Sequence, residues 1–281
     1  MDRLIFHNNR IIDAAQSRLS PLNAGALYGW GVFTTIRVFD RVVLAFDRHW
    51  DRLQRHADQA QISIPIDSTQ ASQAIVGLIA ANSTRNGRAR VTVLKGDAGG
   101  WRVADGPEVE FLIFTTAEEP RALRSPAITI SPYRILSHGP LAGIKRTAML
   151  ENLLALEEAR SRDFGEAVML NERGEIVGAT AANLFWANSD ELFTPSLATG
   201  CVAGITRGIT LDLARRLNLR VTEGSFPIQR LLDADEAFLT STARGITPVV
   251  SFDIKKYDSG GAWVTRLLDR EFQKLIVDAK I

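Results

Sequence analysis

A short charged segment with two prolines divides the chain. Residues 117–126 read AEEPRALRSP, a composition typical of a connector rather than of a helix or strand. On both sides of it, segments with the period of strands alternate with segments that have the period of helices. We therefore predict two domains of α+β (α/β) character, residues 1–116 and 128–281, joined by a connector over 117–127.

The overall composition agrees with a chain of two such domains. It has 281 residues, of which 46% are hydrophobic and 23% charged. A net charge of +1 offers no electrostatic basis for binding nucleic acid or an anionic membrane. The start MDRLIFHNNR lacks the apolar core of a signal peptide, and no apolar run approaches the roughly 18 residues of a membrane span. Because Cys201 is the only cysteine, no internal disulfide is possible, and we predict a cytoplasmic protein.

The histidines do not have metal-ligand spacing. Of His7, His49, His56 and His138, only His49 and His56 are close, and seven residues separate them by about two helical turns. The sequence also lacks a Walker loop, a dinucleotide-binding glycine motif and a nucleophile elbow. We expect no metal site.

The hydrophobic periods predict the elements of each half. In the first half we expect strands over 3–9, 32–40, 41–47, 89–96 and 109–116, and helices over 46–62 and 68–83. In the second half we expect a strand over 127–134, two or three short strands within 166–195, and a strand from 236 that runs into a hydroxyl-rich turn. Helices are expected to follow Lys145 and to cover 204–219 and 261–276.

Lys145 has unusual neighbours for a lysine. It stands in GPLAGIKRTAML, among small and apolar residues at the expected start of a helix. An amine held against apolar surface loses hydration, which lowers its pKa, and a neutral amine can form a Schiff base with an aldehyde. The alternative is that the lysine stem lies on the core while its charged head stays in water. This segment alone leaves both possibilities open.

Two turns in the second half are suited to a phosphate group. In TGCVAGITRG, Gly204 allows close backbone approach, and Ile205 and Thr206 open a helix whose free N–H groups attract a dianion. In FLTSTARG, Ser241 and Thr242 could donate further hydrogen bonds. Alternatively, Thr206 is an ordinary helix cap and the second segment an ordinary turn. A phosphorylated aldehyde cofactor would need both the lysine and such turns.

Together these segments resemble one enzyme family along nearly the whole chain. LNAGALYGWGVFTTIRVFD, RHWDRL, LAGIK with LENLLALEEA, NLFW, GITR and STARGITPV resemble, in order, the motifs of the fold-type IV pyridoxal phosphate enzymes. That family includes branched-chain and D-amino acid aminotransferases and aminodeoxychorismate lyase. The resemblance implies a two-domain fold like that of D-amino acid aminotransferases, with residues 128–281 as the cofactor-binding domain. It also implies pyridoxal 5'-phosphate as cofactor, a small amine or carboxylate substrate, a site between the domains, and a homodimer.

The resemblance assigns roles to individual residues. Lys145 would hold the cofactor and then act as general base on the substrate carbon. Arg52 would bind the cofactor phosphate together with the residues of the two turns, which are Gly204, Ile205, Thr206, Ser241 and Thr242. Asn183 and Gly178 would lie beside the cofactor.

Gly178 departs from the family pattern. A glutamate usually stands there and pairs with the pyridine nitrogen, which keeps the nitrogen protonated. Glu175 lies three residues earlier, so on a regular strand its side chain should point to the other face. The protein could be catalytically impaired, could have lost the cofactor chemistry, or could catalyse a reaction that needs a weaker electron sink. We adopt the third interpretation.

Several features lean toward the lyase. Phe33 and Thr34, in FTT, resemble the lyase strand, where aminotransferases of branched-chain type more often carry a glutamate at the position of Thr34. We therefore predict a catalytic role for Thr34 and substrate contact for Phe33. Lys95 and Arg102, around KGDAGGWR, could receive a substrate carboxylate or could be solvated charges.

The predicted reaction converts 4-amino-4-deoxychorismate to 4-aminobenzoate and pyruvate. The alternatives are an aminotransferase for branched-chain amino acids, D-amino acids or amines, and a binding protein without catalysis or cofactor. The sequence does not determine the stereochemistry of the substrate or whether the pocket accepts a ring or an aliphatic chain.

Overall fold

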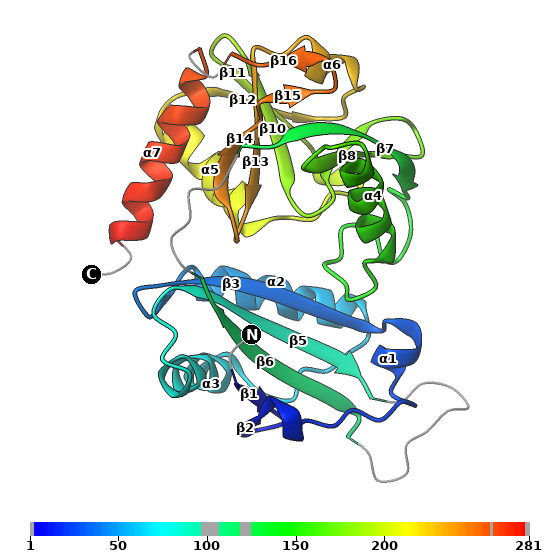
Figure 1. Ribbon diagram of the computed structural model, residues 1–281, viewed down its shortest axis with the longest axis vertical. Helices are drawn as coiled ribbons and strands as arrows, with labels where there is room; N and C mark the ends of the chain where they lie inside the picture. The colour runs from blue at the N-terminus through cyan, green and yellow to red at the C-terminus, as the bar shows by residue number, and fades with distance from the viewer. Residues whose placement is uncertain (1–2, 97–106, 119–124, 259–260, 279–281) are drawn as a thin grey trace. The chain divides into compact units, whose positions relative to one another are not determined.

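The computed structural model describes residues 3–96, 107–118, 125–258 and 261–278 (Figure 1). The chain divides into two compact units. The first comprises Met1–Arg121 and Ile144–Ala148, and the second comprises Ala122–Gly143 and Met149–Ala279. The five residues around Lys145 therefore belong to the first unit, which differs from the predicted boundary that placed all of 128–281 in the second domain.

The described part of the first unit contains one six-stranded antiparallel sheet, in the order β2-β1-β6-β5-β3-β4. Its strands are β1 (Leu4–His7), β2 (Arg10–Asp13), β3 (Gly31–Phe39), β4 (Val42–Val43), β5 (Gly87–Lys95) and β6 (Val109–Ala117). The helical segments are η1 (Ala14–Gln16), α1 (Ala24–Tyr28), α2 (Phe46–Gln59) and α3 (Ser68–Ala81). Buried side chains of α2, α3, β3, β5 and β6 form its core, so the two longer helices cover one face of the sheet.

Alternation along β3 separates two sets of side chains. Val32, Ile36 and Val38 are buried in the core under the helices. Phe33 pairs with Thr92 on β5, and Thr35 pairs with Arg90. Because successive strand residues point to opposite faces, Phe33, Thr92 and Arg90 lie on the face opposite to α2 and α3.

The strand predicted over 41–47 is mostly wrong. Only Val42–Val43 is a strand, and α2 already begins at Phe46. Ala45 adopts a left-handed φ of 52°, which ends the extended run. Phe46 was included in both the predicted strand and the predicted helix. It stacks on Trp50, one helical turn later, so it belongs to the helix.

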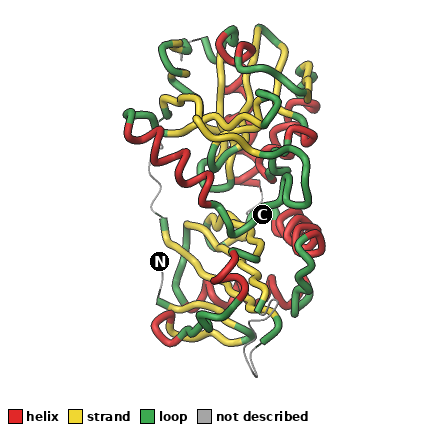
Figure 2. Tube along the Cα trace, turned by 90° about the vertical axis from the view of Figure 1, so that its right-hand side faces the viewer, coloured by secondary structure: helices red, strands yellow, loops and turns green. Residues whose placement is uncertain are grey.

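The described part of the second unit contains two five-stranded sheets, in the orders β12-β11-β10-β13-β14 and β16-β15-β7-β8-β9. The strands are β7 (Ala127–Ile135), β8 (Glu166–Asn171), β9 (Ile176–Ala179), β10 (Asn183–Asn188), β11 (Glu191–Pro195), β12 (Arg220–Gly224), β13 (Glu236–Ser241), β14 (Gly245–Pro248), β15 (Ser251–Phe252) and β16 (Lys255–Lys256). The helical segments are α4 (Leu150–Ser161), η2 (Leu197–Thr199), α5 (Ile205–Arg216), α6 (Gln229–Leu232) and α7 (Trp263–Asp278). Figure 2 shows the strands in the interior of the unit and helical segments around them.

Residues 166–195 are all described and form four strands, not two or three. Trp186, Phe193 and Leu239, from three of the strands of one sheet, share a core with Val168 of the other sheet. The antiparallel sheet of the first unit and the mixed parallel and antiparallel sheets of the second, together with separate helices, confirm the predicted α+β character of the chain. None of the helices in the described residues has the length and apolar character needed to span a bilayer.

Candidate functional site

The segment that contains Lys145 pairs with the edge of β3. The backbone N–H of Phe33 donates to the Lys145 carbonyl at 3.1 Å, and the Thr147 N–H donates to the Gly31 carbonyl at 2.9 Å. Val32 and Arg146 form an antiparallel bridge between these two bonds. Lys145 therefore lies on the Phe33 face of the sheet, with its Nζ 4.5 Å from the centroid of the Phe33 ring. Strand pairing, rather than the helix that begins at Leu150, positions this lysine.

The surroundings of the Lys145 amine favour its neutral form. Burial, followed by the charges of Arg52 and Arg90, lowers its pKa to about 7. The Arg90 guanidinium carbon lies 3.6 Å from the Phe33 centroid, and burial also lowers the pKa of Arg90. Among the described residues, neither Lys145 nor Arg90 forms an ion pair with a carboxylate. The amine can thus gain or lose a proton near neutral pH, in a setting that attracts anions.

Arg52 is held by a buried hydroxyl. Its NH2 nitrogen donates to the Thr34 Oγ1 at 2.9 Å, and Thr34 Oγ1 lies 2.7 Å from the Nδ1 of His49. Burial, followed by the charges of Arg52 and Lys145, lowers the pKa of His49 to about 3, so its ring is neutral. Since Thr34 accepts from Arg52, its one hydroxyl hydrogen is available to His49. Thr34 therefore positions the arginine that was predicted to bind phosphate, and its predicted catalytic role stays a prediction.

In the second unit, Asn183 links the two turns predicted to hold phosphate. It pairs with Thr240 across β10 and β13, one residue before Ser241, and its Nδ2 donates to the Val202 carbonyl at 2.9 Å. Gly204 is the N-cap of α5, and no side chain caps this helix. A Cβ added to Gly204 would lie 2.0 Å from the Asn183 Oδ1. A side chain at Gly204 would therefore force the Asn183 amide to move, whereas the φ of −66° at Gly204 is open to any residue.

The two turns have the chemistry that a phosphate dianion requires. The twelve-residue helix α5 presents its first N–H groups at Ile205 and Thr206 without a side-chain cap. The turn after Ser241 returns into β14 at Gly245, and the Ser241 hydroxyl oxygen accepts from the Arg244 N–H at 3.2 Å. The Thr240 hydroxyl, on the Asn183 face of the sheet, is buried without a partner among the described residues. These groups fit a phosphorylated ligand.

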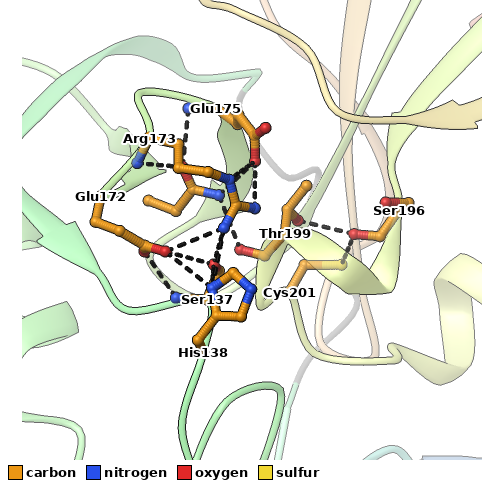
Figure 3. Close-up of polar contacts among 9 residues, drawn as sticks. Ser137, His138, Glu172, Arg173, Glu175, Ser196, Thr199 and Cys201 are labelled. Atoms are coloured by element: carbon orange, nitrogen blue, oxygen red, sulfur yellow. Dashed lines mark hydrogen bonds and ion pairs between the residues drawn. The ribbon is translucent and has the colours of Figure 1, made fainter.

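The Glu175 carboxylate does not take the place of the missing carboxylate at Gly178. It lies in the turn before β9, where Arg173 donates to it at 2.6 Å and Asn171 at 2.8 Å (Figure 3). A register shift between β8 and β9 separates this turn from the Met169–Gly178 pair. We expected strand alternation alone to point the Glu175 side chain away from the Gly178 face, and this explanation is incomplete. The glutamate is outside the strand, and it is engaged by neighbours in the turn.

The same turn anchors the loop that leads toward Lys145. Ser137 donates to the Glu172 carboxylate through its N–H at 2.8 Å and through its hydroxyl at 2.6 Å, and these bonds lower the pKa of Glu172 to about 2. Arg173 donates to the Ser137 Oγ at 2.6 Å. Cys201, nearby, is buried, which raises the pKa of its thiol, so it does not have the properties of a nucleophile. The cluster is thus a structural connection between two loops.

Comparison with known proteins identifies the family. Residues 31–252 match the family described as Amino-transferase class IV. The chain belongs to the class IV aminotransferase family. It is therefore an enzyme of this pyridoxal phosphate family, of either the lyase or the aminotransferase type, and the predicted fold-type IV resemblance is confirmed.

Individual relatives represent both types. The chain is 28% identical over 278 residues to aminodeoxychorismate lyase of Bacillus subtilis, covering 97% of this chain and 94% of the relative. It is 30% identical over 254 residues to a putative branched-chain-amino-acid aminotransferase of Methanocaldococcus jannaschii, covering 89% and 88%. The crystal structure of the branched-chain aminotransferase of Escherichia coli matches with a TM-score of 0.91 and 26% identity, covering 98% of this chain and 95% of that one.

The predicted site residues of this chain lie in both units. Phe33, Thr34, Arg52 and Lys145 are brought together in the first unit, and Lys95, which ends β5, belongs to the same sheet. In the second unit the structure brings Asn183 next to Gly204 and, through the β10–β13 pair, next to the strand that ends at Ser241. Arg102 lies outside the described residues. The cofactor and substrate roles of all these residues stay predictions.

Three residues near Lys145 were not predicted as site residues. They are Arg90, His49 and His56. Strand alternation in ARVTVLKG could have placed Arg90 on one face with Thr92, but not beside a lysine from a segment more than fifty residues away. The helical spacing of His49, Arg52 and His56 shows that they share a helix face, and tertiary contacts alone reveal what that face meets.

The lowered pKa of Lys145 predicts a pH-dependent effect on stability. Below a pH of about 7, the Lys145 amine is protonated in both the folded and the unfolded state, so the folded state carries a buried charge. Between a pH of about 7 and the ordinary lysine pKa of 10.5, the amine is protonated only in the unfolded state. The free energy of unfolding therefore rises with pH in this range. We expect Lys145→Met to raise the Tm of the cofactor-free protein most below pH 7, and less at pH 9. Lys274→Met, at an exposed site on α7, is the control; an equal gain at both pH values for Lys145→Met would contradict the prediction.

The contact between Asn183 and Gly204 predicts non-additive substitutions. Gly204→Ala should lower the free energy of unfolding by about 1–3 kcal/mol, because the new methyl group overlaps the Asn183 amide. Adding Asn183→Ala should remove the overlap, so the double variant should lose less than the sum of the single losses. Denaturant unfolding measures all three variants. Gly77→Ala is the control, since the nearest atom to its new Cβ is 3.8 Å away. Additive losses would show that the two residues do not make the contact described.

Proposed function

We propose that this protein is a pyridoxal phosphate-dependent lyase that converts 4-amino-4-deoxychorismate to 4-aminobenzoate and pyruvate. The observation that carries the proposal is Gly178, at the position where the family usually has a glutamate, together with Glu175, whose carboxylate is engaged by Arg173 and Asn171. A ring nitrogen without a carboxylate partner is less readily kept protonated, so the cofactor is a weaker electron sink. The reaction should therefore be one that makes small demands on that sink.

The described residues support pyridoxal phosphate as the cofactor. Lys145 would hold its aldehyde, and the phosphate would be bound by Arg52, the α5 N-terminus, Ser241 and Thr242. When bound, the cofactor supplies a conjugated ring that accepts the electrons left when a proton is removed from the amine-bearing carbon of the substrate. Two kinds of group are thus present, an amine whose pKa of about 7 makes its neutral form available at neutral pH, and donors for a dianion.

Lys145 has the acid–base properties that the lyase needs. With a pKa of about 7 its amine can accept the proton from the amine-bearing ring carbon at neutral pH, and it can return that proton in a later step. The neighbouring charges of Arg52 and Arg90 favour the neutral form between these steps. Arg90, which has no carboxylate partner among the described residues, is suited to receive a carboxylate of the substrate.

The lyase reaction compensates for a weak electron sink. After proton removal, the ring C–O bond breaks and its electron pair leaves on the oxygen of enolpyruvate, which takes up a proton on carbon to become pyruvate, while the six-membered ring becomes aromatic. Aromatisation stabilises the product, so less stabilisation is required of the carbanion. The overall reaction cleaves one substrate into two products and needs neither an amino acceptor nor a second substrate.

An aminotransferase is the second candidate. It is favoured by the 30% identity to the archaeal branched-chain-amino-acid aminotransferase and by the match to the Escherichia coli enzyme. An aminotransferase must store the amino group on the cofactor between two substrates, so it consumes an acceptor keto acid. Two residues argue for the lyase: Thr34, where aminotransferases of branched-chain type more often carry a glutamate, and Gly178, where the family usually has one.

Product analysis tests the proposal. The protein reconstituted with pyridoxal phosphate should release pyruvate and 4-aminobenzoate from 4-amino-4-deoxychorismate without any keto acid, and Lys145→Ala should reduce the rate by at least about a thousandfold. Borohydride reduction followed by mass spectrometry should locate the cofactor on Lys145 of the wild type. Turnover only with a keto acid would support the aminotransferase. No cofactor on Lys145 would support a relative without this chemistry.

A second prediction concerns Gly178 itself. Its φ of 155° and the Ala182 carbonyl, 3.1 Å from an added Cβ, make any side chain at this position strained. Gly178→Ala therefore measures the steric cost, and Gly178→Glu adds the carboxylate. Relative to Gly178→Ala, we expect Gly178→Glu to increase amino transfer to a keto acid more than pyruvate release. Equal ratios of the two activities in both variants would show that the missing carboxylate does not select the reaction.

A further inference from the structure

His56 makes an unusual contact with the backbone of Lys145. It lies in the last turn of α2 and is 7% exposed. The Lys145 N–H donates to the His56 Nδ1 at 3.0 Å. Because Nδ1 accepts this bond, the hydrogen of the neutral ring is on Nε2. A side chain from the helix face thus holds the main chain of the lysine.

With this bond, both backbone groups of Lys145 have partners. Its carbonyl accepts from the Phe33 N–H at 3.1 Å, and its N–H donates to His56. Two bonds in different directions determine the orientation of the backbone at this residue, and hence the direction of its Cα–Cβ bond. Without His56, the N–H would have to find another acceptor, and the side chain would turn with the backbone. The Nζ position over the Phe33 ring depends on this orientation.

His56 does not have the properties of a proton acceptor for the lysine. Burial, followed by the charges of Arg52, Arg55 and Lys145, lowers its pKa to about 4. The ring is therefore already neutral over the range in which the Lys145 amine loses its proton, near pH 7. Its basic nitrogen is also used by the backbone. The geometry leaves a role in orientation rather than in proton transfer.

We propose that His56 is a positioning residue: as the Nε2–H tautomer it holds the Lys145 backbone and thereby directs the lysine amine toward the face of Phe33 and Arg90. The catalytic consequence rests on the proposed function of Lys145. The structural consequence, an amine with defined surroundings, applies to the protein with or without cofactor.

Two amide substitutions separate this role from general packing. In His56→Asn the amide oxygen can take the place of Nδ1, whereas in His56→Gln it reaches toward the place of Nε2. Thr147→Val is a control on the same segment, because it removes the hydroxyl bond to the Gly29 carbonyl, 2.8 Å long, and leaves the Lys145 N–H bond intact. Circular dichroism verifies that each variant folds.

The first readout uses cofactor-free protein. Competitive acetylation with acetic anhydride over a pH series, quantified on the Lys145 peptide by mass spectrometry, reports the titration midpoint and reactivity of this amine. We expect His56→Asn and Thr147→Val to remain within about twofold of the wild type in reactivity. His56→Gln should lower the reactivity at pH 7 by about tenfold, as its midpoint moves toward that of an ordinary lysine. In reconstituted protein, the same variant should lower kcat with little change in KM.

The results can contradict the two proposals separately. Two results would overturn the positioning role, whatever reaction the enzyme catalyses. One is that Lys145 of folded His56→Gln is acetylated as fast as in the wild type. The other is that folded His56→Asn and His56→Gln lose Lys145 reactivity equally. If the wild type instead fails to attach pyridoxal phosphate to Lys145, the proposed function fails. The acetylation profiles would still decide whether His56 directs the lysine.

Discussion

The hydrogen bonds that join Ile144–Ala148 to β3 are the interaction on which the candidate site depends. Phe33 and Gly31 supply the donor and acceptor on one side, and Lys145 and Thr147 supply their partners on the other. Strand pairing fixes which side chains share a face, so a lysine from late in the chain meets Phe33 and Arg90 from early in it. A helix position for Lys145 would not give this register.

The charges around that lysine have one sign. Burial, followed by the charges of Arg52 and Arg90, lowers the pKa of the amine, and burial and nearby positive charges also keep His49 and His56 neutral. Burying cations close to one another is costly, which is why the amine and both imidazoles favour their neutral forms. In the second unit, no side chain of the described residues caps the start of α5. The two units thus offer positive charge and free N–H groups through different elements, a lysine and arginines in the first and a helix N-terminus in the second.

The electrostatics at Gly178 differ from those expected of the family. Met169 pairs with Gly178, the β8–β9 register shifts directly after this pair, and the carboxylate nearest in sequence, Glu175, is held in the turn beyond the shift. That turn also holds Ser137 through Glu172, so Glu175 cannot move to Gly178 without disturbing a connection between two loops. The absence of a carboxylate at Gly178, from which the proposed function argues, thus depends on the local fold as well as on one residue. It is the main physical reason to prefer the lyase over the aminotransferase.

Much of the fold could be predicted from patterns of short range. The predicted segments 32–40 and 109–116 correspond closely to β3 and β6, and the predicted helix over 68–83 corresponds to α3, because alternation and helical periodicity report burial directly. The strand expected over 41–47 was wrong because adjacent apolar residues fit a strand and a helix start equally well. The segment around Lys145 was assigned to the second domain, because proximity in sequence does not reveal which sheet edge is free to pair.

By itself, the sequence determined the types of chemistry available: a lysine among apolar residues, glycine and hydroxyl turns suited to phosphate, and a glycine where a glutamate is usual. It determined these because residue type and local spacing carry them. Only the tertiary structure decided that Arg90 lies beside Lys145, that Thr34 holds Arg52, that Asn183 excludes a side chain at Gly204, and that His56 holds the lysine backbone. The physical reason is that hydrogen bonds and charges act over a few ångströms in space. The residues they join are far apart along the chain, and no periodic pattern in the sequence connects them.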